Sequence, residues 1–143
     1  MPRRACDCSQ PAMDELQISS GDDVVRVRKQ VRVAAAAGGL SLVDQTKLVT
    51  AASELARNAL IHGGGGVAMV ETVTSVTGRT GIRVTFSDRG PGIADIGLAL
   101  TDGWTTGDGM GLGLSGARRL VDEFDLTSKP GEGTSVVVAK WLR

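Results

Sequence analysis

The chain has 143 residues, of which 41% are hydrophobic and 22% charged, and this composition predicts one globular domain. Sixteen basic and sixteen acidic residues cancel and aromatic residues make up only 3%, which argues against a nucleic-acid binder or an anionic-membrane binder. No stretch approaches the roughly 20 apolar residues of a membrane span. The N-terminus lacks the apolar run of a secretion signal, so we expect a cytoplasmic protein.

The first 15 residues contain Pro2 and Pro11 and little hydrophobic periodicity. This pattern predicts a flexible tail over residues 1–15 before a folded domain over residues 16–143. Cys6 and Cys8 are the only cysteines, and two thiolates with no further cysteine make a poor zinc site. We therefore expect free thiols in the tail.

A short strand is expected at residues 16–19, followed by a helix that runs to about residue 37. Asp22 or Asp23 is the expected N-cap, because a carboxylate accepts hydrogen bonds from the free amides of a first turn. Two glycines then end the helix.

A second helix is expected over residues 42–61, with Ser41 as its N-cap. Its buried stripe has spacings of three and four and comprises Leu48, Ala52, Leu55 and Ala59. Glu54 and Asn58 are four residues apart and share another face. Two interpretations of this pair are open: an ordinary solvated helix face, or an amide oxygen for Mg²⁺ with a carboxylate that accepts a proton one turn away.

The second half of the chain alternates strand patterns with glycine-rich segments. A loop with one short helical candidate, residues 96–101, is expected between Asp88 and Gly113. The other expected elements are strands at residues 67–76 and 81–87, a helix at 114–123, and strands at 125–128 and 134–140. This order predicts an α+β fold: a two-layer sandwich with a mixed, mostly antiparallel sheet and helices on one face.

Three short segments follow the second helix, and each is ambiguous alone. Asp88-Arg-Gly-Pro-Gly92 is either a plain turn or a carboxylate that accepts a hydrogen bond from adenine. Gly109-Met-Gly-Leu-Gly113 runs into a helix, so it is either a flexible hinge or a backbone cradle for phosphates. Gly131-Glu-Gly-Thr134 alone is typical of a hairpin turn. Together with Glu54–Asn58, in this order, they predict a nucleotide site.

These four segments resemble the N box and glycine boxes of the Bergerat-fold ATPase superfamily of gyrase, Hsp90 and histidine kinases. The resemblance covers about residues 16–143. Within the superfamily the chain resembles the small anti-sigma-factor serine/threonine kinases, since nothing remains for a sensor or dimerisation domain. Ser53–Asn58, Asp122–Asp125 and Lys140–Arg143 are similar to segments of the RsbT-type switch kinases of bacterial stressosomes.

The resemblance implies an ATP- and Mg²⁺-dependent protein kinase with Glu54 as its catalytic base and Asn58 as its magnesium ligand. The residues implied in ATP binding are Asn58, Asp88, Gly90, Gly92, Ile93, Gly109, Met110, Gly111, Leu112, Gly113 and Thr134. It also implies a serine or threonine substrate on a STAS-domain partner, and an effector such as a PP2C-type phosphatase as a second partner.

Two alternatives remain open. One is an ATP-binding anti-sigma or switch module that acts mainly by binding partners. The other is a detached histidine-kinase catalytic domain. This alternative is disfavoured because such domains usually have an amide side chain at the position where this chain has Glu54. The glycine loop itself departs from an ideal phosphate cradle, because Asp108 adds a negative charge at its entrance and no lysine lies within it.

Overall fold

Five strands form one sheet in the order β1-β2-β3-β5-β4, and each neighbouring pair is antiparallel. The computed structural model describes residues 13–90 and 113–142. Its elements are β1 Met13–Ile18, α1 Gly21–Gly38, α2 Leu42–Ile61, β2 Gly66–Thr74, β3 Thr80–Asp88, α4 Gly113–Leu120, β4 Glu123–Lys129 and β5 Gly133–Trp141. The expected fold class is confirmed, and its described strands contain no parallel pairing.

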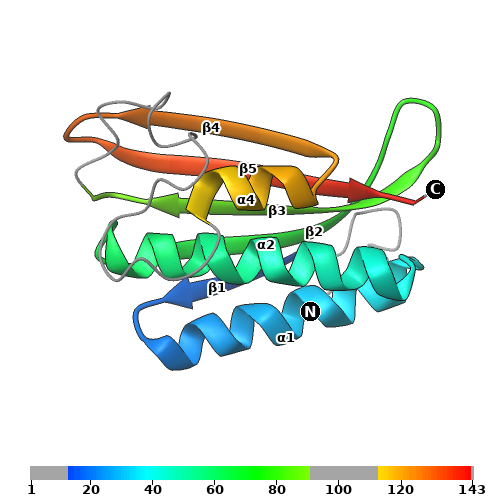
Figure 1. The fold of residues 1–143 in the computed structure, drawn as a ribbon, viewed down its shortest axis with the longest axis horizontal. Coiled ribbons are helices and arrows are strands. Elements are labelled where there is room, and N and C mark those ends of the chain that lie inside the picture. The colour runs from blue at the N-terminus through cyan, green and yellow to red at the C-terminus, as the bar shows by residue number, and fades with distance from the viewer. Residues whose placement is uncertain (1–12, 91–112, 143) are drawn as a thin grey trace, which may run out of the picture.

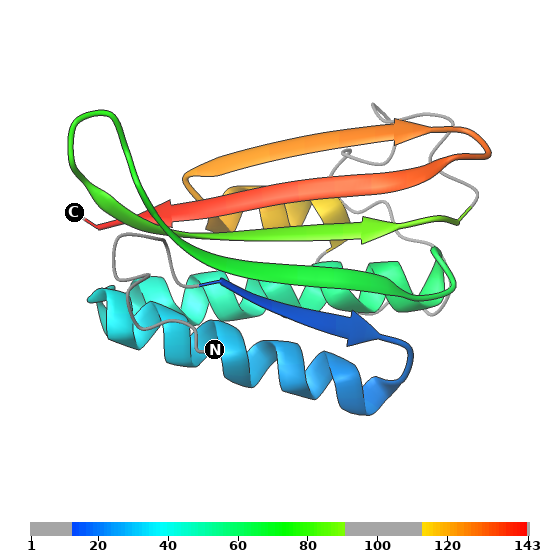
Figure 2. The same ribbon diagram turned by 180° about the vertical axis from the view of Figure 1, so that it is seen from behind.

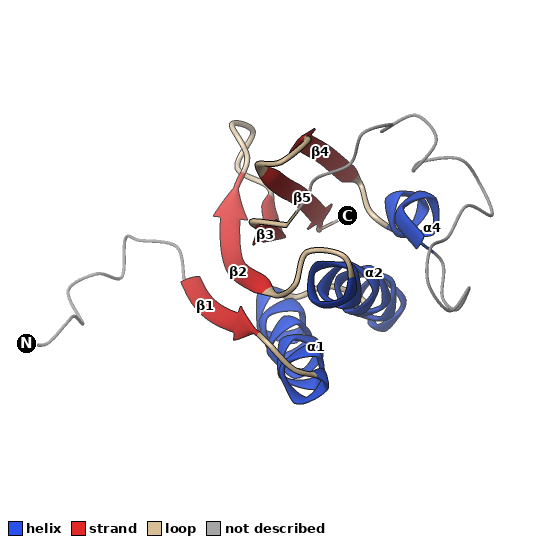
Figure 3. Cartoon of the chain, turned by 90° about the vertical axis from the view of Figure 1, so that its left-hand side faces the viewer, coloured by secondary structure: helices blue, strands red, loops and turns tan. Residues whose placement is uncertain are grey.

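The three described helices cover one face of the sheet. Figure 1 shows α1, α2 and α4 in front of the strands, and Figure 2 shows the same strands uncovered from behind. The end-on view of Figure 3 shows the sheet curving around the helical layer. None of the described helices is long and apolar enough to cross a membrane.

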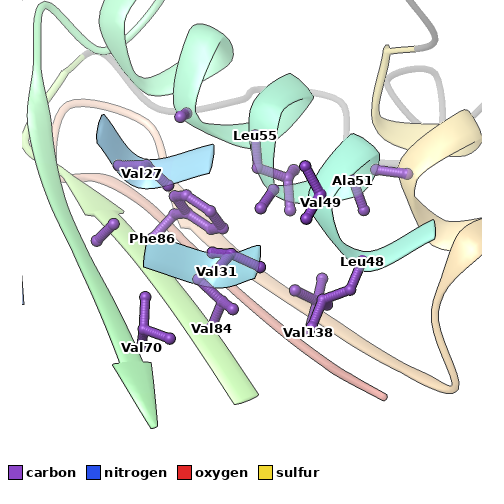
Figure 4. Packing of buried hydrophobic residues seen from close by; sticks show 14 of the residues in the cluster. Val27, Val31, Leu48, Val49, Ala51, Leu55, Val70, Val84, Phe86 and Val138 are labelled. Atoms are coloured by element: carbon purple, nitrogen blue, oxygen red, sulfur yellow. The ribbon is translucent and has the colours of Figure 1, made fainter. Parts of the chain in front are cut away.

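The core lies between the two layers and is mainly aliphatic. Residues two apart on a strand share a face, and Ile82, Val84 and Phe86 of β3 are all buried toward the helices. Figure 4 shows Phe86 and Val84 packed against Val27 and Val31 of α1. Each such side chain contributes about 1.5–3 kcal/mol by leaving water. The stripe expected on α2 is buried throughout.

The start of α1 corrects one prediction. The N-cap is Ser20, and neither Asp22 nor Asp23 holds that position. Asp23 instead lies inside the first turn, and its carboxylate points back toward Ser19. Asp23 Oδ2 accepts two hydrogen bonds from Ser19, one from the backbone N–H at 2.9 Å and one from the side-chain hydroxyl at 3.0 Å. These bonds, foremost that from the backbone N–H of Ser19, together with the contact to Arg26, lower the pKa of Asp23 from 3.8 to about 2.

The second helix matches its prediction, and several other boundaries shift. The N-cap Ser41 accepts a hydrogen bond from the backbone N–H of Asp44 at 3.1 Å. The helix expected to reach residue 123 ends at Leu120, because the chain after it already pairs with β5: the N–H of Asp122 donates to the carbonyl of Ala139 at 2.9 Å. β1 begins at Met13, inside the expected tail. Residues 96–101 and the two cysteines lie outside the described residues.

Candidate nucleotide site

One end of the sandwich collects the segments that the sequence singles out. In Figure 1 the last turn of α2, the end of β3, the start of β5 and the start of α4 all lie at the left of the molecule. Antiparallel pairing places the end of β3 beside the start of β5, with Asp88 opposite Thr134. Segments far apart in sequence therefore meet at one end of the sandwich.

Glycines from three different segments pack closely around Asp88. A Cβ on Gly63, which follows α2, would lie 2.4 Å from Asp88 Cγ, so only glycine fits there. A Cβ on Gly90 would lie 2.6 Å from Gly63 Cα, and one on Gly133 would lie 2.1 Å from the carbonyl oxygen of Asp88. The backbone N–H of Gly90 donates to Asp88 Oδ1 at 2.9 Å, which fixes the orientation of the carboxylate.

Gly63 lies at this candidate site and was not among the predicted site residues. In the sequence, Gly63 belongs to a run of four glycines, residues 63–66, and such a run is typical of the end of a helix. The contact with Asp88 couples the end of α2 directly to the end of β3. The available signal was the position of this run, one turn after Asn58, with more glycines than a helix end requires.

Asp88, Thr134 and Ser128 form a row across three neighbouring strands. The register pairs Asp88 of β3 with Thr134 of β5, and Thr134 with Ser128 of β4. Asp88 and Thr134 lie on the helix-covered face, because the positions two residues away, Phe86 and Val136, are buried there. Ser128 Oγ lies 2.9 Å from Thr134 Oγ1 and donates to the carbonyl of Gly133 at 3.1 Å. Ser128 was not predicted.

Glu54 and Asn58 lie on the last two turns of α2, and both are partly buried. Their spacing of four places them on one helix face, as expected. The contact between Gly63 and Asp88 brings this end of the helix to the row on the sheet. No group of three or more histidine, cysteine or acidic side chains within the described ranges could hold a metal ion by itself.

The glycine loop is described only at its final residue. Gly113 is the first residue of α4, which packs against α2, and Leu114 and Ala117 of α4 are buried in the core. The basic pair Arg118 and Arg119 lies exposed in the last turn. The predicted site residues that lie outside the described residues are Gly92, Ile93, Gly109, Met110, Gly111 and Leu112.

A cavity of about 910 Å³ lies close to the same end of the sandwich, but it opens on the face of the sheet that the helices do not cover. It is lined by Gln17, Met69 and Thr85, which alternate with the core positions of their strands, and it reaches Asp88 at one corner. The two partly buried residues on α2, Glu54 and Asn58, are not among its lining residues.

Comparison with known proteins identifies the family. Residues 43–143 match the family of histidine kinase-, DNA gyrase B- and HSP90-like ATPases. The chain belongs to this family. It is 44% identical over 121 residues to the serine/threonine-protein kinase RsbT of Bacillus subtilis (strain 168), which covers 85% of this chain and 90% of that relative. It is also 32% identical over 108 residues to an anti-sigma F factor of Pasteuria penetrans, which covers 72% of each chain.

Two solved structures share the fold. The RsbU and RsbW domains of Rv1364c from Mycobacterium tuberculosis superpose with a TM-score of 0.63 at 24% identity. The histidine kinase domain of the blue-light activated kinase from Erythrobacter litoralis EL346 superposes with a TM-score of 0.50 at 21% identity. The first superposition covers 93% of this chain and 33% of the solved chain. The second covers 85% of this chain and 60% of the solved chain. The predicted ATPase-type fold is confirmed.

The family predicted from the four segments is confirmed as well, including its serine/threonine kinase branch. Membership of an ATPase family implies ATP binding by this chain, and the kinase and anti-sigma relatives imply protein partners.

Proposed function

We propose that this chain is an ATP- and Mg²⁺-dependent serine/threonine protein kinase that phosphorylates a STAS-domain partner in a bacterial stress-signalling, partner-switching pathway. The 44% identity to RsbT over most of both chains supports the activity. The observation that carries the proposal is the meeting of α2 and β3: Gly63 abuts Asp88, and the end of α2 that carries Glu54 and Asn58 thereby adjoins the strand that carries Asp88.

In this proposal the base of ATP binds at Asp88. One oxygen of its carboxylate is occupied by the N–H of Gly90, and the other can accept a hydrogen bond from the amino group of adenine. Thr134, opposite Asp88 in the register, offers a second polar contact. Gly90, Gly92 and Ile93 complete the proposed wall around the base.

The phosphates and their metal are assigned to the other half of the site. Asn58 supplies one hard amide oxygen, and a single protein oxygen suits Mg²⁺, which keeps waters and binds phosphates for its remaining positions. The bound Mg²⁺ would neutralise charge on the phosphates. The backbone amides of residues 109–113 lead into the N-terminus of α4, a position that favours anions.

Glu54 is the proposed base. Its carboxylate accepts the proton of a serine or threonine hydroxyl, the hydroxyl oxygen bonds to the γ-phosphorus, and the bond to ADP breaks. Orientation and charge neutralisation supply most of the acceleration in phosphoryl transfer. A PP2C-type phosphatase is the proposed effector that binds this chain when the substrate is phosphorylated, and the cytoplasm is the proposed location.

An ATP-binding switch module that acts mainly by binding partners is the second candidate, and the anti-sigma F relatives favour it. One experiment separates the two. The chain is incubated with ATP and each STAS-domain protein encoded in the same genome, with Mg²⁺ or with EDTA, and the products are analysed by mass spectrometry. Mg²⁺-dependent, acid-stable phosphoserine or phosphothreonine supports the kinase. ATP-dependent complex formation without any phosphoprotein contradicts it and supports the module.

A further inference from the structure

We propose that the cavity on the uncovered face of the sheet binds an extended, basic segment of a partner protein. This cavity, the sheet groove, has a volume of about 910 Å³. Pockets that hold ligands commonly measure about 300–1,000 Å³. The sheet groove adjoins the candidate nucleotide site at Gly63 and Asp88, and neither Glu54 nor Asn58 lines it. A segment bound there leaves the proposed catalytic residues uncovered.

Two rows of side chains across neighbouring strands form the floor of the sheet groove. The register pairs them across β1, β2 and β3 as Glu15, Met69 and Thr85 in one row and Gln17, Val67 and Ser87 in the other. All six alternate with the core positions of their strands, so they face the side that Figure 2 shows uncovered. The floor therefore offers apolar contacts together with hydroxyl and amide groups for hydrogen bonds to a peptide backbone.

A run of four glycines leaves one wall of the sheet groove without side chains. Residues 63–66 all line the cavity. A Cβ on Gly65 would lie 2.8 Å from the carbonyl oxygen of Ile18, and one on Gly66 would lie 2.2 Å from that of Ser87. Neither position can carry a side chain without a shift of the backbone. The hollow is therefore a consequence of how this loop packs against β1 and β3.

The charged side chains of the sheet groove are mainly acidic. Its lining contains three carboxylates, those of Glu15, Asp88 and Glu132, and one guanidinium, that of Arg89. Within residues 13–90 and 113–142, no basic side chain forms an ion pair with Glu15 or Glu132. The excess negative charge favours a basic occupant.

Two other acidic residues on the same face are matched within the chain. Glu71 Oε1 lies 3.1 Å from Nε of Arg83, and Glu123 Oε2 accepts a hydrogen bond from the indole N–H of Trp141 at 2.7 Å. Neither glutamate lines the sheet groove. The carboxylates left for an external cation are thus those at the groove.

The separation of Glu15 and Glu132 indicates an extended chain instead of a compact cation. Glu15 lies on β1, and Glu132 directly precedes β5. Three strand spacings separate β1 from β5, which is about 14 Å at ~4.8 Å per spacing. An extended chain covers that span in roughly four residues. The bound segment should therefore carry two basic side chains at least about four residues apart.

The test uses a fluorescein-labelled hexapeptide with lysine at both ends and alternating valine and serine between them. Its binding is measured by fluorescence anisotropy without nucleotide, so that the result does not depend on the proposed kinase activity. The wild-type chain should bind it at least about tenfold more tightly than the same peptide with glutamate at both ends, because like charges repel. Added salt should weaken the binding of the lysine peptide.

Two substitutions test the contribution of the carboxylates. The double variant Glu15→Gln, Glu132→Gln should bind the lysine peptide about fivefold more weakly, since exposed ion pairs contribute modestly. Both side chains are exposed, so the fold should not depend on them. The matched control is Asp125→Asn, an exposed carboxylate of the same face that does not line the sheet groove, and it should bind as the wild-type chain does.

Amide NMR signals locate the bound peptide. Titration with the lysine peptide should shift the signals of Gly64, Gly65 and Thr85, which line the sheet groove, and leave that of Val33 on α1 unchanged. Equal binding of the two peptides, wild-type affinity in the double variant, or shifts only outside the groove overturns the inference. Absence of phosphoprotein in the kinase experiment contradicts the proposed function alone, so the two failures are distinguishable.

Discussion

At the scale of single residues, the candidate site is built around positions where a side chain is absent. Gly63, Gly90 and Gly133 surround Asp88, and none of the three can carry a Cβ without a shift of its neighbours. Asp88 and Gly90 were predicted as site residues from the sequence. Gly63 and Ser128 were not predicted, because their place at the site comes from contacts across segments that local pattern does not encode.

Gly63→Ala should therefore weaken ATP binding. Its new Cβ would lie 2.4 Å from Asp88 Cγ and 2.7 Å from Oδ2, which pushes the carboxylate out of position. We expect a loss of about 1–3 kcal/mol in binding free energy, as for a polar group that loses its partner. Titration calorimetry measures it. Gly21→Ala is the matched control, because a Cβ there meets nothing within 4 Å. Equal affinities for both variants would refute the role of Gly63.

Asp23 should make stability depend on pH in the acid range. Its pKa is lowered from 3.8 to about 2 by the bonds from Ser19 and the contact to Arg26. A carboxylate with a lowered pKa in the folded state stabilises the fold above its unfolded pKa and loses that effect as the pH falls through the folded value. The stabilisation should be complete above about pH 4 and disappear toward about pH 2.

The measurement is urea unfolding of the wild-type chain and Asp23→Asn at several pH values. At neutral pH Asp23→Asn should be the less stable protein, and the gap should close between about pH 4 and about pH 2. Asp22→Asn, next to it and exposed, serves as control. A gap that stays constant over this range would show that the charge of Asp23 contributes nothing.

At the scale of elements, the boundaries of α2 follow from local sequence, whereas the end of α4 is set by tertiary hydrogen bonds. The bounds of α2 were predicted from Ser41 and the apolar stripe, both of which are local. The end of α4 was overestimated, because Asp122 and Glu123 are drawn away from the helix by tertiary bonds. Asp122 Oδ2 accepts from the N–H of Trp141 at 2.8 Å, and Glu123 Oε2 accepts from its indole N–H at 2.7 Å. Helical propensity gives no sign of these partners.

The N-terminal end of α2 is linked to the sheet by a buried lysine. Lys140 of β5 is 2% exposed, and its Nζ lies 3.3 Å from Asp44 Oδ1 and 3.3 Å from Asp122 Oδ1. Asp44 lies in the first turn of α2, and Asp122 precedes β4. The end of α2 opposite the site is thereby tied to two other elements.

Lys140→Met should destabilise the fold by about 3–5 kcal/mol, because it leaves carboxylates without their buried cation. Urea unfolding monitored by circular dichroism gives the value. Lys129→Met, at the exposed end of β4, is the matched control and should change stability by less than about 1 kcal/mol. If the two variants have the same free energy of unfolding, the ion cluster around Lys140 does not stabilise the attachment of α2 to the sheet.

At the scale of the whole molecule, the order of elements was predictable, and so was part of the candidate site, since Asp88 and Thr134 are neighbours. Strand pairs joined by short turns led to the correct sheet class, and the helices cover one face as expected. The sequence also predicted that Glu54, Asn58, Asp88 and Thr134 form one site. What it could not provide is register, since a shift by one residue would turn Thr134 away from Asp88.

We propose above all that the two layers meet to form a kinase site with Glu54 as its base. The most direct measurement is single-turnover phosphorylation of the STAS-domain substrate by the wild-type chain, Glu54→Gln and the control Asp125→Asn, with ATP affinity measured in parallel. We predict that Glu54→Gln lowers the rate about 10²–10⁴-fold with ATP affinity unchanged, while exposed Asp125→Asn is as active as wild type. A wild-type rate in Glu54→Gln would contradict the account.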